Sequence, residues 1–261
     1  MSEKSTAVFD YTRSLATSAS PQYITQPIFQ SRFACITRNA LDRMKLINFS
    51  EAEMAAIYEV VRANWARGID KVYPHEESRE FKLKGYVWDY DPNGKEESLL
   101  LVLHLLEALY NMGWILYSAV EVTKKVSTKD SLVFRQLDHI PPPCEWISIS
   151  FHAGDKLKVL NKPPPELTDE IIATFITDIQ RHEVTTERTK IKFKNFPWSV
   201  SGYDNAESQI KLLALLGVLE RHGFTLYTRT TARYSDETSE SNVLIFKRRR
   251  DWVLGTPLYR Q

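Results

Sequence analysis

Apolar and polar residues alternate along several short segments of the chain, a pattern typical of strands with one buried face. The alternation covers Ala34–Arg38, Arg43–Ile47, Glu80–Trp88, Trp114–Thr123 and Ser131–Gln136. The first two segments and the last two are each close enough in sequence to form a hairpin. The first half of the chain is therefore expected to build an antiparallel sheet.

Helical patterns separate these strands at two places. Ser50 with Glu53 has the spacing of a capping box, which predicts a helix from Glu51 to about Ala66. A second helix is expected over Leu99–Met112, where Gly113 ends it in the position that favours glycine.

The whole pattern occurs twice. Phe81–Trp88 aligns with Ile191–Trp198, and with unchanged spacing Gly113–Tyr117 aligns with Gly223–Tyr227. A chance match would not keep its register through a strand, a helix and a second strand, so we interpret the chain as a duplicated unit.

Each unit reads β-β-α-β-α-β-β. In the second unit the helices are expected at about Thr168–His182 and Ser208–Arg221. The sequence thus predicts an α+β fold of two tandem, pseudo-equivalent units, with antiparallel sheets and helices on one face of each sheet. The other face of each sheet is expected to stay open.

Composition shifts suggest the boundaries of these units. Residues 1–30 are rich in Ser, Thr, Gln and Pro and are expected to form a flexible arm. The first α+β repeat is placed at 31–140 and the second at 141–250, with a stiff Pro141–Pro143 linker between them and a short tail at 251–261.

Two segments of the first unit resemble a known family. Phe81-Lys82-Leu83-Lys84-Gly85…Trp88 and Gly113-Trp114…Lys129-Asp130…Leu132…Phe134-Arg135 are similar to F-K-L-K-G-x-P-W and G-W-x-L…K-D-x-L-x-F-R in an uncharacterised eukaryotic, mainly fungal, family. Val87 departs from the expected proline, which the second unit has at Pro197. The resemblance implies the duplicated fold and no activity.

The bulk composition is that of an ordinary globular protein. The chain has 34 Lys+Arg and 33 Asp+Glu, with 43% hydrophobic residues. These values exclude a disordered or disulfide-dense chain. No apolar run approaches the roughly 20 residues of a membrane span, and Cys35 and Cys144 are the only cysteines. A cytoplasmic protein is expected, with a nuclear one as the alternative.

No catalytic motif emerges from the sequence. The six histidines lack metal-ligand spacing, no glycine-rich phosphate loop is present, and no cofactor is expected. Asp42 and Asp155 match across the repeats, but each lies in a hairpin connection, where Asp bonds backbone amides. The leading hypothesis is a non-catalytic interaction or scaffold protein. A small-ligand or enzymatic site in a cleft between the repeats remains an alternative.

Basic residues repeat on the strands. Alternation puts them on the helix-free faces, where they are candidates for binding RNA, DNA or anionic lipid. These candidates are Arg43, Lys45, Lys82, Lys84, Lys156, Lys158, Lys192 and Lys194. Trp88 and Trp198 are candidates for stacking on bases. The competing interpretation is that the lysines are solvated residues that protect the strands.

The helix over 99–112 is apolar on nearly every side, which requires cover on more than one side. Its copy has Gln209, Lys211 and His222 at the equivalent places. The candidate partner surface is therefore Leu99, Leu101 and Met112. The second repeat, the N-terminal arm, a protein partner and a second copy of the chain are all open as its cover.

Overall fold

The structure is a computed structural model that describes residues 30–88, 96–120, 128–199, 206–233 and 240–258. The elements below belong to one compact unit, Ser31–Gln261. In order, the first half contains β1 (Phe33–Asn39), β2 (Arg43–Ile47), α1 (Glu51–Asn64), β3 (Ile69–Pro74), β4 (Ser78–Leu83), α2 (Glu96–Asn111), β5 (Trp114–Val120) and β6 (Thr128–Gln136). The second half contains β7 (Cys144–His152), β8 (Lys156–Leu160), α3 (Pro165–Thr174), β9 (Ile179–Val184), β10 (Arg188–Phe193), α4 (Ala206–Arg221), β11 (Thr225–Arg233) and β12 (Glu240–Arg249).

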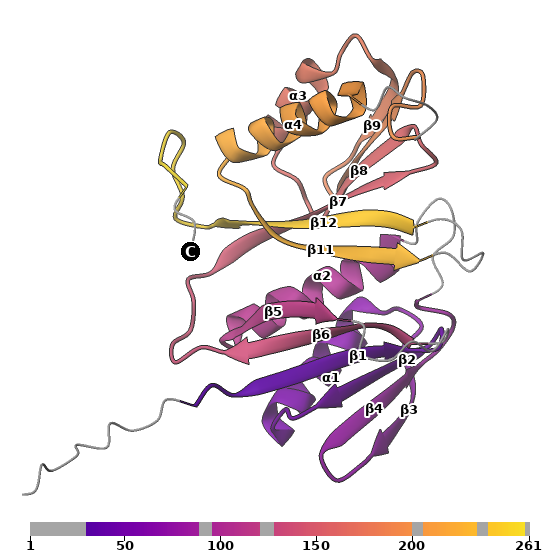
Figure 1. Ribbon diagram of the computed structural model, residues 1–261, viewed down its shortest axis with the longest axis vertical. Helices are drawn as coiled ribbons and strands as arrows, with labels where there is room; N and C mark the ends of the chain where they lie inside the picture. Colours follow the sequence, from indigo (N-terminus) through magenta and orange to yellow (C-terminus); the bar gives the residue numbers. More distant parts are fainter. Residues whose placement is uncertain (1–29, 89–95, 121–127, 200–205, 234–239, 259–261) are drawn as a thin grey trace, which may run out of the picture. The chain divides into compact units, whose positions relative to one another are not determined.

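The two halves have the same topology, and the predicted α+β fold with a duplicated unit is confirmed. Sheet 1 has the strand order β3-β4-β2-β1-β6-β5, and sheet 2 has the equivalent order β9-β10-β8-β7-β12-β11. Neighbouring strands in both sheets pair antiparallel, as in the register of β1 with β2 and of β7 with β8. Figure 1 shows the two sheets and the four described helices.

The sequence missed one strand in each unit. β3 follows α1 directly, and its side chains are half-buried or exposed, so no apolar alternation marks it. In the second half the predicted helix over 168–182 was wrong in its length. α3 ends at Thr174, and the chain then turns into β9, whose residues after Ile179 are all exposed. Edge strands of this kind carry little hydrophobic pattern.

The predicted start of α1 and the predicted end of α2 are confirmed. The Ser50 hydroxyl accepts a hydrogen bond from the Glu53 amide, while the Glu53 carboxylate accepts one from the Ser50 amide at 2.7 Å. Gly113 ends α2 with a φ of +85°, in the left-handed region that other residues avoid. α2 begins at Glu96, one turn before the predicted start at Leu99.

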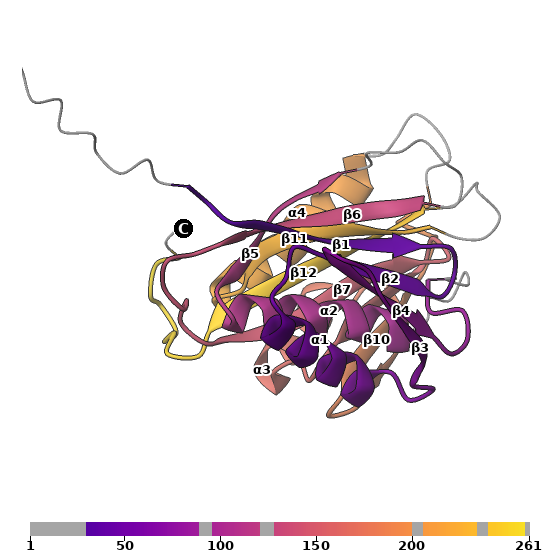
Figure 2. The ribbon, with the colours of Figure 1, turned by 90° about the horizontal axis from the view of Figure 1, so that it is seen from below.

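Two apolar cores follow from this arrangement. In the first, the helix-covered face of sheet 1 packs with α1 and α2, which lie together on one side of β1 and β6 in Figure 2. In the second, one face of sheet 2 packs with α3 and α4. The first core also takes in residues from the opposite face of sheet 2, namely Cys144, Trp146, Leu160, Val243 and Ile245.

α2 therefore lies between the two sheets. The expectation that both sheets keep an open face was wrong for sheet 2, because α2 of the first half covers the face that α3 and α4 leave free. The physical reason is the stripe of large apolar residues on α2, which one sheet alone cannot bury.

Candidate interaction surface

The contact of α2 with sheet 2 has a charged end at Glu96. The Glu96 carboxylate lies 2.9 Å from the Lys190 ammonium, 3.2 Å from that of Lys158 and 2.8 Å from the Arg188 guanidinium. Burial acts to raise the pKa of Glu96, but its hydrogen bond to Lys190 and the charge of Lys158 outweigh burial and lower it. Lys158 is 7% exposed, and burial lowers its pKa. We call Lys158, Arg188 and Lys190, the three cations of sheet 2 that bind the Glu96 carboxylate, the Glu96 site.

The other end of the contact is aromatic. The ring of Tyr110 meets Trp146 edge-on at 5.3 Å and Tyr227 at 6.0 Å. The Lys247 ammonium donates to the Tyr110 hydroxyl at 3.0 Å. Burial raises the pKa of Tyr110, raises that of Tyr227 to about 12 and lowers that of Lys247. We call Trp146, Tyr227 and Lys247, the residues of sheet 2 that contact the Tyr110 side chain, the Tyr110 site.

Sheet 1 repeats the Tyr110 site on the face away from α1 and α2, which we call its outer face. Phe33 takes the place of Trp146 and pairs across the strands with Arg135, as Trp146 pairs with Lys247. Tyr117 meets Phe33 edge-on at 5.5 Å, and Tyr227 meets Trp146 edge-on at 4.8 Å.

The copy on sheet 1 is exposed, whereas the Tyr110 site is covered by α2. Phe33 is 41% exposed and Tyr117 is 63% exposed. We call Phe33, Tyr117 and Arg135 the open site. Sequence reasoning missed it as a site, although the alignment of the repeats already places Phe33 with Trp146 and Tyr117 with Tyr227.

The predicted basic residues do not form one common surface. Lys158 is buried behind α2, so it offers no charge to a polyanion. On sheet 1, Arg43 is bound to Glu80, and Lys82 is bound to Asp70 at 2.8 Å, a hydrogen bond that raises the pKa of Lys82.

The remaining basic candidates are divided between the two halves. Lys192 lies 3.5 Å from Asp155, and Lys194 donates to the Thr177 carbonyl at 2.9 Å. Lys156 faces the same side of sheet 2 as Lys158, and Lys84 lies just beyond the end of β4. Lys45 also lies on the outer face of sheet 1, and no ion pair joins it to the described residues.

Of the two tryptophans proposed to stack on bases, Trp88 is a core residue and Trp198 is partly buried. Trp88 is 0% exposed and donates to the Arg43 carbonyl at 2.7 Å, so it cannot stack on a base. Trp198 packs against Phe151 at 4.7 Å and Phe193 at 5.4 Å.

The predicted partner residues on α2 are inside the chain. Leu99 and Leu101 are 2% and 0% exposed, and Met112 packs against the same core. The stripe does meet a partner, but that partner is sheet 2 of the same chain. Of the covers that the sequence left open, the structure shows the second repeat, so Leu99, Leu101 and Met112 are not a surface for another molecule.

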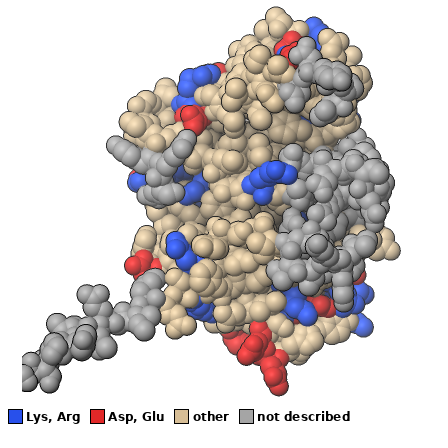
Figure 3. All heavy atoms as spheres, viewed as in Figure 1, with Lys and Arg blue, Asp and Glu red and all other residues tan. Residues whose placement is uncertain are grey.

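Figure 3 shows how charge is distributed over one face of the molecule. Lys and Arg atoms stand in small separate groups, several with Asp or Glu atoms beside them, and uncharged surface lies between them. On that face the described residues form no continuous basic band of the kind that follows a nucleic-acid backbone.

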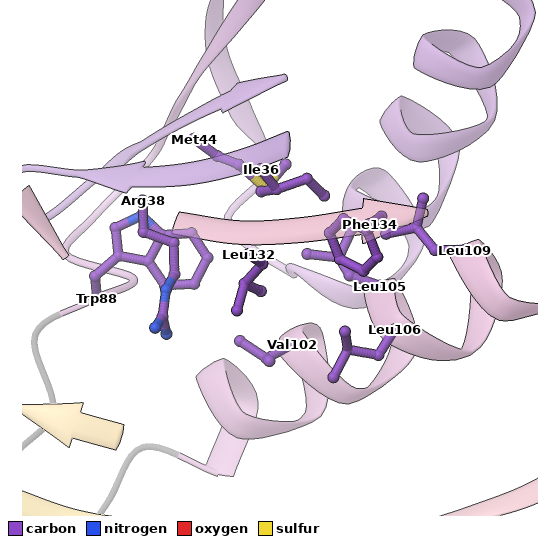
Figure 4. A pocket seen from close by; sticks show the side chains of 10 residues that line it. All are labelled: Ile36, Arg38, Met44, Trp88, Val102, Leu105, Leu106, Leu109, Leu132 and Phe134. Atoms are coloured by element: carbon purple, nitrogen blue, oxygen red, sulfur yellow. The ribbon is translucent and has the colours of Figure 1, made fainter. Parts of the chain in front are cut away.

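Two hollows lie among the described residues. A cavity of about 10 Å³ beside Trp88 holds at most one water and is lined by apolar side chains and Arg38 (Figure 4). The Arg38 guanidinium lies 5.7 Å from the Trp88 ring, where the second half packs Phe151 on Trp198. A shallow hollow of about 450 Å³ beside Lys192 and Phe196 lies within the second half.

The side chains of Ser150 and His152, which could take part in catalysis, lie inside the protein. Ser150 and His152 share a hydrogen bond at 2.8 Å, but both are buried, at 0% and 2% exposed. Within the described residues, no three His, Cys, Asp or Glu side chains are grouped as metal ligands. In the same part of the chain, no helix is both long and apolar enough to cross a membrane.

Comparisons with known proteins agree with the duplication. One domain-family model matches residues 32–135 and matches again at 145–247. A search of the curated proteins by sequence finds no match. A crystal structure of a conserved kinetoplastid-specific protein from Trypanosoma cruzi aligns at 16% identity over 41% of this chain and 96% of that chain, with a TM-score of 0.31. That low score supports no inference about function.

Proposed function

The chain belongs to the family whose domain model matches it twice, and from this premise we propose that it is a non-catalytic interaction protein. Its partner-binding surface is the outer face of sheet 1. The observation that carries the proposal is the open site, because it repeats the aromatic and cationic arrangement that holds α2 on sheet 2.

The residues around the open site support the same proposal. Val133 and Ile47 take the places of Ile245 and Leu160, which are buried beneath α2. On sheet 1 both equivalents are only half-buried. The outer face thus carries apolar side chains at the positions where sheet 2 binds a helix, and exposed apolar surface of this kind is typical of interaction sites.

Binding of RNA, DNA or anionic lipid is the weaker alternative. Lys82 and Arg43 are already neutralised by Asp70 and Glu80, and Lys158 is buried. A polyanion gains affinity by replacing counterions around unpaired cations, so residues paired within the protein contribute little to it.

The test compares proteins captured by the full chain and by two variants. Tyr117→Glu places a carboxylate in the open site, and Leu213→Glu is the matched control on α4, where Leu213 is 66% exposed. Native-cell lysate is treated with nuclease, and captured proteins are quantified by mass spectrometry. We expect a protein set that Leu213→Glu retains and Tyr117→Glu loses. Identical sets for both variants, or loss of the set on nuclease treatment alone, would overturn the proposal.

A further inference from the structure

We propose that the outer face of sheet 1 binds an amphipathic helix of another protein, one that presents a leucine stripe ending in a tyrosine. This inference rests on the proposed function and adds the chemistry of the partner. The inference uses the contact between α2 and sheet 2 as its template. There a helix packs on the face of sheet 2 that is equivalent to the outer face of sheet 1.

The template defines the stripe. Leu99, Leu103, Leu106 and Tyr110 follow one another at spacings of four, three and four residues, which puts them on one side of a helix. All four are buried. Glu96 and Tyr110 place this side of α2 against sheet 2, although Leu106 also lines the cavity beside Leu132 and Phe134 of sheet 1. The outer face of sheet 1 carries Val133 and Ile47, so a helix with the same stripe fits it.

The tyrosine is the specific element. On sheet 2 the Tyr110 ring receives two aromatic edges, and its hydroxyl accepts a hydrogen bond from Lys247. The open site keeps both functions, because Phe33 and Tyr117 supply the rings and Arg135 supplies the donor. Aromatic residues of this type contribute strongly to binding, since they bury a large area and retain one polar group.

The charged end of the template is only partly kept. Lys45 stands at the place of Lys158, but Glu80 stands at the place of Lys190 and is bound to Arg43. The outer face therefore accepts a single acidic residue near the start of the partner helix. A helix with several acids there would face Glu80, so the surface selects against a strongly acidic partner.

A second copy of the chain is a poorer occupant. α4 is the helix that a copy would present, and its outward residues include Gln209 and Glu220 at the places of Leu99 and Tyr110. Docking α4 on the open site would bury the Glu220 carboxylate against Phe33 and Tyr117, and a single ion pair with Arg135 does not ensure that this desolvation is repaid.

The experiment uses the full chain and a soluble host helix of Ala, Glu and Lys. One labelled peptide carries Leu, Leu, Leu and Tyr at the spacing of Leu99, Leu103, Leu106 and Tyr110. The control peptide carries Gln, Leu, Leu and Glu, the equivalent residues of α4. Fluorescence anisotropy measures binding, and chemical-shift changes locate it.

We expect the first peptide to bind and the control to bind at least tenfold more weakly. Tyr117→Glu should weaken the first peptide at least tenfold, and Arg135→Ala should weaken it several-fold. Leu213→Glu should leave it unchanged. Shift changes should centre on Phe33, Val133 and Arg135.

Three results would overturn the helix inference. They are equal binding of both peptides, binding that Tyr117→Glu does not affect, and self-association in sedimentation that Tyr117→Glu abolishes. If Tyr117→Glu loses a captured protein while the helix peptide does not bind, the helix inference fails and the proposed function stands. If the peptide binds at the open site but no captured protein depends on it, the proposed function fails instead.

Discussion

α2 and α4 are copies of one helix that end in opposite surroundings. Nine residues of α2 are buried, whereas three of α4 are. α2 is enclosed by both sheets, while α4 covers one face of sheet 2 and turns Ile210 and Leu213 outward. The comparison teaches that a repeated sequence need not give repeated environments, because stacking two units buries only one of the two helices on both sides.

The largest test of this comparison substitutes matched leucines. Leu103→Ala removes a side chain that is 0% exposed between the sheets, and we expect a loss of about 3 kcal/mol in the free energy of unfolding. Leu213→Ala alters the equivalent position of α4, where Leu213 is 66% exposed. This substitution should change the free energy of unfolding by no more than about 0.5 kcal/mol. Urea denaturation measures both, and similar losses would mean that α2 is not enclosed.

Glu96→Gln tests the charged end of the enclosed helix. It leaves Lys158 buried beside Lys190 without a carboxylate, and we expect a loss of about 2 kcal/mol. This is less than for a fully buried pair, because Arg188 and Lys190 reach solvent. Glu97→Gln is the matched control, since Glu97 is exposed. Equal effects of the two substitutions in urea denaturation would contradict the ion-pair geometry.

The contribution of Glu96 should also depend on pH. Lys190 and Lys158 hold its folded-state pKa below the ordinary value of 4.5, against the effect of burial. A carboxylate with a lowered folded pKa stabilises the protein above its unfolded pKa, and the stabilisation is lost as the pH falls through the folded value. The difference between wild type and Glu96→Gln should be complete at about pH 7 and shrink below about pH 4.5. Urea denaturation at a series of pH values from neutral to acid measures this difference. A difference in the free energy of unfolding that stays constant over the series would contradict a lowered pKa of Glu96.

Removing one hydroxyl gives a smaller effect. Tyr110→Phe loses the hydrogen bond from Lys247 and should cost about 1 kcal/mol. Tyr117→Phe makes the same change at the exposed ring of the open site and should leave the free energy of unfolding unaltered. Thermal denaturation of the two variants compares the Tyr110 site with the open site. A loss of stability in Tyr117→Phe would show that another part of the chain already occupies the open site.

The smallest expected effect concerns the basic residues. Lys82→Glu combined with Lys192→Glu should not change the anisotropy of labelled single-stranded RNA at low or high salt, because both lysines already face Asp70 and Asp155. Binding to wild type that weakens with salt and vanishes in the double variant would restore the polyanion alternative.

The duplication, its α+β class, the start of α1 and the end of α2 could be read from the sequence, since these are recorded in spacing and in residues such as Ser50 and Gly113. β3 and β9 could not, because exposed edge strands show no alternation. The sequence also indicated that α2 needs cover on two sides, through Gln209 and Lys211 in its copy. It could not name sheet 2 as that cover, because periodicity describes one element at a time and says nothing of which surfaces meet.

The enclosure of α2 gives the molecule a direction. Each unit has a sheet face that can bind a helix and a helix that can bind such a face. Where the two halves join, α2 of the first half binds sheet 2 of the second half. On α4 the equivalent helix surface has Gln209 and Glu220 on either side of the exposed Leu213, while the outer face of sheet 1 keeps Phe33 and Tyr117 exposed. Any stack built from such modules would stop at α4, so growth would proceed only from the side of sheet 1.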